Sequence, residues 1–162
     1  MDGRVAHLNL HNNKLTSCSE LDFFTPIGIY TLAETMTVNK VPQLQTLILS
    51  DNDLTSMELM DWDGHFHDEC LIRLFKGLEA VQATLTHLDI SRTGLGREGV
   101  HIVVDALSKT PYQLQHLSLS GNYFDTEGTR ALAGCISRCI AWLWLSTPFL
   151  TFLFLFVFAA KN

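Results

Sequence analysis

The chain has 162 residues, 47% of them hydrophobic, and a net charge of −6, which suits one compact domain. An acidic balance without clusters of Lys and Arg argues against binding to a phosphate backbone, so we expect no nucleic-acid partner. The first ten residues, MDGRVAHLNL, do not resemble a secretory signal, because no long apolar segment follows the basic residue.

A template of apolar residues at positions 1, 4, 6 and 11, usually with Asn at position 9, occurs four times along the chain. Positions 4 and 6 lie on one side of a short strand, while positions 1 and 11 bury the chain as it enters and leaves the strand. An Asn amide at position 9 can bond to backbone groups at the turn, so we expect Thr93, which replaces it once, to hold that corner less well. The four copies are Val5, Leu8, Leu10, Asn13, Leu15; Leu44, Leu47, Leu49, Asn52, Leu54; Leu85, Leu88, Ile90, Thr93, Leu95; and Leu114, Leu117, Leu119, Asn122, Phe124.

Each predicted strand is followed by apolar residues at i, i+3, i+4 and i+7, the spacing of one helix face, and the fourth face is the weakest. The copies start near residues 5, 44, 85 and 114, at intervals of 39, 41 and 29. We therefore predict units of about 29 residues, with insertions around 16–26 and 55–66 in the first two. The predicted faces are Ile29, Leu32, Ala33, Met36; Leu71, Leu74, Phe75, Leu78; Val100, Val103, Val104, Leu107; and Thr129, Leu132, Ala133, Ile136.

The segments LDISRTGLGREGVHIVVDAL and LSLSGNYFDTEGTRALAGCI resemble ribonuclease-inhibitor-type leucine-rich repeats. The resemblance covers about residues 5–139 and implies an α/β solenoid, a horseshoe with parallel strands on its concave face and helices on its convex face. It says little about function, because relatives include inhibitors, immune receptors and the Ran GTPase-activating protein. The chain departs from the family in its insertions and in its few repeats. We predict a leucine-rich-repeat domain over residues 1–139.

Strand positions 3, 5 and 7 are expected to face the concave surface, where a partner would bind. Parallel strands lie about 4.8 Å apart, so each position becomes a row across the sheet. The rows are mostly polar, and Ile48 is their only apolar member. The predicted partner-binding residues, row by row, are His7, Thr46, His87, His116; Asn9, Ile48, Asp89, Ser118; and His11, Ser50, Ser91, Ser120.

Two groups of residues resemble metal ligands: the histidines of the position 3 row, and the segment DWDGHFHDEC at 61–70. Neither has the four-ligand spacing of a zinc site, and Gly64 stands at the wrong offset for an EF-hand loop. We interpret the row as solvent-facing or protein-binding residues. The segment is better explained as a surface loop before a helix, where Asp68 and Glu69 favour the helix N-terminus. We therefore predict no metal and no cofactor.

Residues 140–160, IAWLWLSTPFLTFLFLFVFAA, form an uncharged run of 21 residues. As a helix it would be about 30 Å long, the thickness of a bilayer's hydrocarbon core. Trp142 and Trp144 lie near one end, as interfacial anchors do. We predict a hydrophobic tail at 140–162 with a transmembrane helix over 140–160. A degenerate terminal repeat and an artefactual tail on a fragment of a longer repeat protein are the alternatives.

A fifth repeat can be placed in two registers. The regular spacing starts it at Leu143 and puts Pro148 at a buried strand position, where it cannot donate to the sheet. A start at Ile140 fits the apolar positions better but requires a short link from the preceding helix. We therefore expect the regular array to end near residue 139.

No nucleophile–base pair, phosphate-binding loop or paired-carboxylate motif stands out, so we predict that the chain is not an enzyme. We expect a protein–protein interaction module or scaffold with a protein partner, no small-molecule substrate, and a membrane tether if the tail inserts. The alternative is a regulator of a partner enzyme, such as a GTPase-activating or inhibitory repeat domain. The cysteines show neither CxxC nor disulfide-framework spacing, which indicates reduced thiols and a cytoplasmic location.

Overall fold

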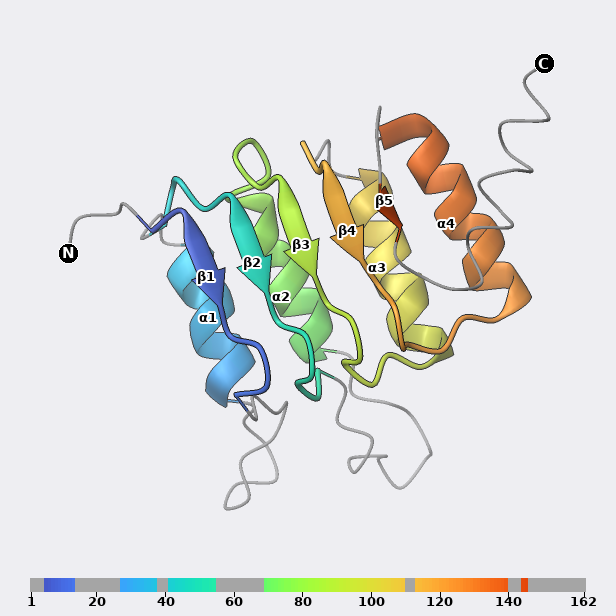
Figure 1. The fold of residues 1–162 in the computed structure, drawn as a ribbon, viewed down its shortest axis with the longest axis horizontal. Helices are drawn as coiled ribbons and strands as arrows, with labels where there is room; N and C mark the ends of the chain where they lie inside the picture. Colours follow the sequence, from blue (N-terminus) through green and yellow to red (C-terminus); the bar gives the residue numbers. More distant parts are fainter. Residues whose placement is uncertain are drawn as a thin grey trace.

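A computed structural model describes residues 5–13, 27–37, 41–54, 69–109, 113–139 and 144–145. Five parallel strands form one sheet in the order β1-β2-β3-β4-β5, and the helices lie behind one face of it (Figure 1). This arrangement confirms the predicted α/β architecture of alternating strands and helices. The elements are β1 (His7–Asn9), α1 (Ile27–Thr37), β2 (Thr46–Ile48), α2 (Glu69–Glu79), β3 (His87–Asp89), α3 (Arg97–Lys109), β4 (His116–Ser118), α4 (Thr126–Cys139) and β5 (Trp144–Leu145).

The leucines at position 4 align across the sheet. Leu8 is in register with Leu47, which is in register with Leu88, which in turn is in register with Leu117. The last three are completely buried, while Leu8, in the first repeat, is only partly buried. Complete burial of a leucine side chain stabilises a fold by about 2 kcal/mol, so this interior row is a main source of cohesion between repeats.

The predicted helix faces of α1, α2 and α3 are buried against the sheet, apart from Leu32, which is partly exposed. In α4 the face is weaker, as predicted: Leu132 is buried, whereas Thr129 and Ala133 are half-buried. Helices α1 and α2 approach each other closely at Gly77. A Cβ on Gly77 would lie 2.8 Å from the carbonyl oxygen of Ala33, so only glycine fits at this contact.

Every strand in the first four repeats ends in the same left-handed turn. Position 8 of the template has a positive φ in all four copies: 51° at Asn12, 57° at Asp51, 50° at Arg92 and 72° at Gly121. Asn, Asp and Gly adopt this conformation at low cost, whereas Arg92 is an unusual occupant. The turn therefore repeats in backbone geometry although its side chains differ.

Asn at position 9 binds the turn of its own repeat to that of the preceding one. The Asn122 amide donates to Ile90 O at 2.8 Å and Leu119 O at 3.1 Å, and its oxygen accepts from the backbone N–H groups of Thr93 and Leu95. Asn52 likewise donates to Leu10 O and Leu49 O. Thr93 is fully buried, and its hydroxyl donates to Ile90 O within its own repeat.

The sheet continues into the predicted hydrophobic tail. Trp144 is in register with His116, and Leu145 with Leu117, so the prediction of a helix over 140–160 is wrong at these two residues. The register corresponds to a repeat starting at Trp142, 28 residues after Leu114, and to neither start considered from the sequence. The physical reason is that strand pairing with β4 fixes position 4 at Leu145, which keeps the repeat length constant.

Several predictions concern parts of the chain outside the described residues. These are the insertion at 16–26, the insertion at 55–66 and most of the loop at 61–70, together with the remainder of the tail. Within the described ranges, none of the helices has the length and hydropathy needed to cross a bilayer.

Candidate functional site

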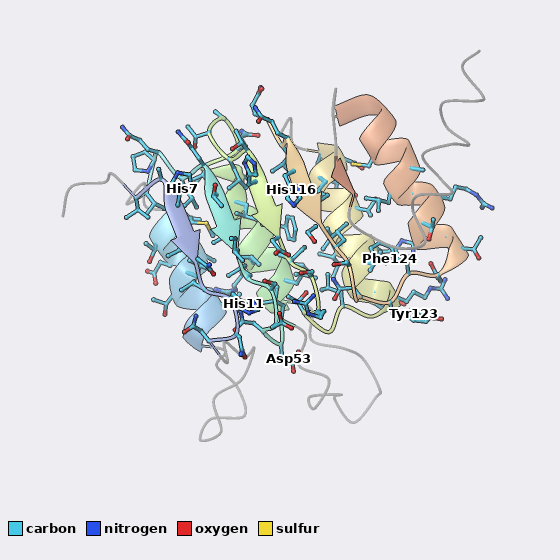
Figure 2. All side chains as sticks on the ribbon, viewed as in Figure 1. His7, His11, Asp53, His116, Tyr123 and Phe124 are labelled. Carbon is cyan, nitrogen blue, oxygen red and sulfur yellow. The ribbon has the colours of Figure 1, made fainter. Side chains whose placement is uncertain are left out.

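The sheet surface that faces away from the helices, which we call the open sheet face, carries the predicted rows (Figures 1 and 2). His7, Thr46, His87 and His116 are in register across β1 to β4, so the position 3 row is continuous. His7 and His116 lie near the strand starts, and His11 lies at the other end of the sheet (Figure 2). The structure therefore brings the predicted residues together on one surface.

The position 3 row contains two contacts between repeats. Nδ1 of His7 lies 2.9 Å from the Thr46 hydroxyl, and the His87 and His116 rings stack with their centroids 5.8 Å apart. Nδ1 of His87 is 2.9 Å from the hydroxyl of its neighbour Thr86. Both rings of the stacked pair keep part of their surface in contact with solvent.

Rows 5 and 7 are partly engaged in local bonds. Oδ1 of Asn9 accepts from the backbone N–H of His11, and Oδ1 of Asp89 accepts in the same way from Ser91, at 2.9 Å in each case. The Ser91 hydroxyl also donates to Asp89 at 2.6 Å. These side chains stabilise the strand ends, as well as forming part of the surface.

Three of the predicted contact residues offer little surface. Ser50, Ser91 and Ser118 are only 3–5% exposed, because larger neighbours in the same rows cover their small side chains. We therefore correct the predicted contact set: these serines lie on the open sheet face but cannot make extensive contact with a partner. The accessible members are His7, Asn9, His11, Thr46, Ile48, His87, Asp89, His116 and Ser120.

An ion-pair network borders this face at the position 8 turns, and sequence reasoning missed it. Arg92 Nε donates to Asp51 Oδ1 at 2.6 Å, and His11 Nδ1 lies 3.1 Å from Asp51 Oδ2. The hydrogen bond from Arg92 lowers the pKa of Asp51 below its ordinary value of 3.8, with smaller contributions from the charges of Arg92 and His11. Extending the template to position 8 would have revealed the row Asn12, Asp51, Arg92 and Gly121.

Arg92 also lies against the next repeat. A Cβ on Gly121 would come within 2.5 Å of Arg92 Cγ, so the absence of a side chain at Gly121 leaves room for the arginine. Two residues further along, Tyr123 is 65% exposed. Tyr and Arg are frequent at the energetic centres of protein interfaces, so this corner adds two candidate contact residues that the sequence did not single out.

A second polar cluster joins α3 to the start of α4. Arg97 lies 3.0 Å from Asp125 and 3.1 Å from Glu127, and His101 is 3.9 Å from Asp125. Asp125 also accepts from the backbone N–H of Gly128 at 2.6 Å, as the N-cap of α4. His101, Asp125 and Glu127 are close enough to share a cation. However, the Arg97 guanidinium already pairs with both carboxylates, so the arrangement fits a structural ion pair better.

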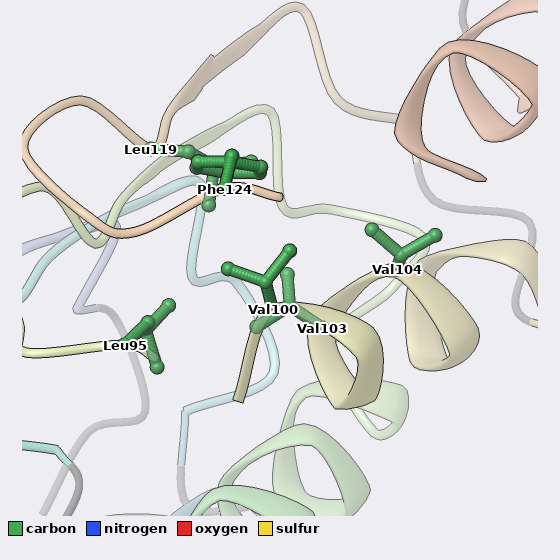
Figure 3. A pocket seen from close by; sticks show the side chains of 6 residues that line it. All are labelled: Leu95, Val100, Val103, Val104, Leu119 and Phe124. Carbon is green, nitrogen blue, oxygen red and sulfur yellow. The ribbon is translucent and has the colours of Figure 1, made fainter. Parts of the chain in front are cut away.

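An apolar hollow lies beneath the last turn (Figure 3). It has no room for a water molecule, and so it cannot accept a ligand as it stands. It is a small packing gap in the core, lined by Leu95, Val100, Val103, Val104, Leu119 and Phe124.

Comparison with known proteins agrees with the repeat analysis. Two family models described as leucine-rich repeat match residues 81–100 and 113–135, the third and fourth repeats. A segment of 55 residues, 34% of the chain, is 43% identical to the human protein named NACHT, LRR and PYD domains-containing protein 13. That segment spans only 5% of the relative's length, so the match concerns the repeats and not the whole relative.

Proposed function

Because the chain is a leucine-rich-repeat protein, we propose that it is a non-catalytic protein-binding module whose open sheet face docks a protein partner. Repeats of this kind suggest protein–protein interaction, and stacking them produces an extended surface suited to it. The observation that carries the proposal is the alignment of exposed polar side chains in rows across four strands.

The composition of the open sheet face supports a protein partner more than a small molecule. Its accessible side chains are spread over four repeats, and adjacent strands lie about 4.8 Å apart, so the surface is wide. Protein interfaces need a wide surface of this kind, whereas small-molecule sites are concave and mostly apolar.

We place the protein in the cytoplasm on the basis of its cysteines. Cys135 is a completely buried thiol in α4, which suits a reducing compartment. A membrane tether through residues 140–160 stays a prediction from the apolar sequence. Regulation of a partner enzyme is a narrower form of the same proposal, because such a regulator also acts by binding.

The experiment compares two single substitutions that each place a glutamate on an exposed position. His87→Glu alters the open sheet face, and Ile72→Glu alters the exposed side of α2, where Ile72 is 53% exposed. The tagged full chain captures partners from cell extract, and each captured protein is then purified and its affinity measured directly. A nucleotide-hydrolysis assay follows if a captured partner is a GTPase.

We expect His87→Glu to weaken binding at least tenfold and Ile72→Glu to leave it unchanged, with both variants folded by circular dichroism. The opposite pattern would move the docking surface to the helices and contradict the proposal. Equal binding by both variants and the unmodified chain would contradict it as well.

A further inference from the structure

We propose that the His87–His116 pair binds carboxylate side chains of an acidic segment of the protein partner, and that protons are taken up when this complex forms. This inference rests on the proposed function and specifies the chemistry of the partner. Its starting point is the stacking of two imidazole rings from adjacent repeats, with centroids 5.8 Å apart, on the open sheet face.

The ring nitrogens of the pair are available to a partner. Nδ1 of His87 bonds to the Thr86 hydroxyl. Among the residues that the structure describes, no hydrogen-bond partner occurs for Nε2 of His87 or for either nitrogen of His116. A protonated imidazole uses both nitrogens as donors, and a carboxylate is the acceptor that forms the strongest bonds with it.

The charges around the pair favour an acidic partner. Thr46 in the same row is uncharged, and His7 carries a third imidazole beyond it. The residues at position 2, beside the strand starts, are also uncharged: Ala6, Gln45, Thr86 and Gln115. The starts of β1 to β4 therefore bear histidines and no acidic side chain at these two positions, although the whole chain has a net charge of −6.

The charged groups on the neighbouring elements are engaged elsewhere. Asp89, two residues after His87, accepts two hydrogen bonds from Ser91. Arg92, after β3, pairs with Asp51, which follows β2 and also lies beside His11. Within the described part of the chain, no helix packs against this face, because the helices lie behind the sheet (Figure 1).

Proton uptake follows from the stacking. Two adjacent protonated rings repel each other in the unbound protein, and a carboxylate placed against them removes that repulsion. Histidine changes its charge between about pH 5 and 8, so a partner carboxylate would favour the charged pair in that interval. By linkage, affinity increases by up to about tenfold per pH unit for each proton bound.

The probe for this inference is hexaglutamate, with hexaglutamine as the uncharged control. Side-chain NMR of the full chain, labelled at histidine, follows each titration at pH 6.0 and pH 7.5. We expect hexaglutamate to shift the His87 and His116 signals, to bind about fivefold or more tightly at pH 6.0, and to weaken as salt is added. Hexaglutamine should cause no shift.

Matched variants locate the effect. His87→Gln with His116→Gln should remove both the binding and its pH dependence, whereas His101→Gln, on α3, should retain them. Absence of hexaglutamate binding, binding independent of pH, or equal loss in the His101 variant would overturn the inference. Binding of a thymidine hexanucleotide in place of hexaglutamate would overturn the assignment to carboxylates.

Failure of this inference is distinguishable from failure of the proposed function. If His87→Glu abolishes partner binding while hexaglutamate does not bind, the open sheet face remains the docking surface and only the acidic partner is excluded. If neither effect occurs, both are excluded.

Discussion

Asp51 and Arg92 occupy the same left-handed turn position in consecutive repeats, and Arg92 Nε donates a hydrogen bond of 2.6 Å to Asp51 Oδ1. This pair connects the second and third repeats, which have Thr93 in place of the usual Asn in the later repeat. It therefore supplies a side-chain contact between turns at the interface where the asparagine pattern is interrupted.

Replacing Arg92 with Gln should raise the pKa of Asp51 toward its ordinary value, because the hydrogen bond from Arg92 is the main cause of its depression. A carboxyl whose pKa is lower in the folded state contributes stability above its unfolded value of 3.8, and this contribution is lost as the pH falls through the folded value. An NMR titration of the Asp51 carboxyl carbon checks this. An unchanged midpoint in the variant would contradict the assigned cause.

Replacing Asn122 with Ala should destabilise the fold by about 3 kcal/mol, since it removes the partners of four backbone groups in two adjacent turns. Thr93→Ala removes one hydrogen bond to Ile90 O and should cost about 1 kcal/mol. Urea unfolding of both variants measures the difference. Equal costs would mean that the Asn side chain contributes no more than Thr at this position.

Gly121→Ala should destabilise the fold by about 1–2 kcal/mol, because the backbone has a φ of 72° and the new Cβ meets Arg92. Introducing the same change in an Arg92→Ala background separates the two causes. The cost should decrease there but not disappear, since the left-handed backbone remains unfavourable for alanine. Complete recovery would show that the contact alone requires glycine.

The position of a leucine in the array should determine its contribution. Leu88→Ala, in the middle of the interior row, should cost about 3–4 kcal/mol, because Leu88 is completely buried between two neighbours. Leu8→Ala should cost less, because Leu8 is only partly buried. Thermal unfolding of the two variants compares them. A larger cost at Leu8 would contradict the nearest-neighbour stacking of repeats.

The strand cores were predictable because burial imposes a strict period. Leu47, Leu88 and Leu117 recur in phase with their neighbours at positions 1, 6 and 11, and the structure places them in one buried row. The open sheet face followed from the same period, since strand side chains alternate between two sides. Its buried serines could not be foreseen, because their exposure depends on the sizes of neighbours in adjacent repeats.

The position 8 network and β5 were harder to predict for different reasons. Asp51 and Arg92 are 41 residues apart and become partners only when the repeats are superposed, including the insertion between them. For β5, Leu145 aligns with Leu117, but the next interior position of that register is Thr147. The apolar pattern alone therefore favoured other registers.

Carbethoxylation of histidines in the complex with a purified partner tests most directly whether the open sheet face is the docking surface. Mass spectrometry compares the modification rate of each histidine with and without the partner. We expect strong protection of His7, His87 and His116 and an unchanged rate at His101, which lies on α3. Protection of His101 alone, with the three strand histidines still reactive, would contradict the proposed docking surface.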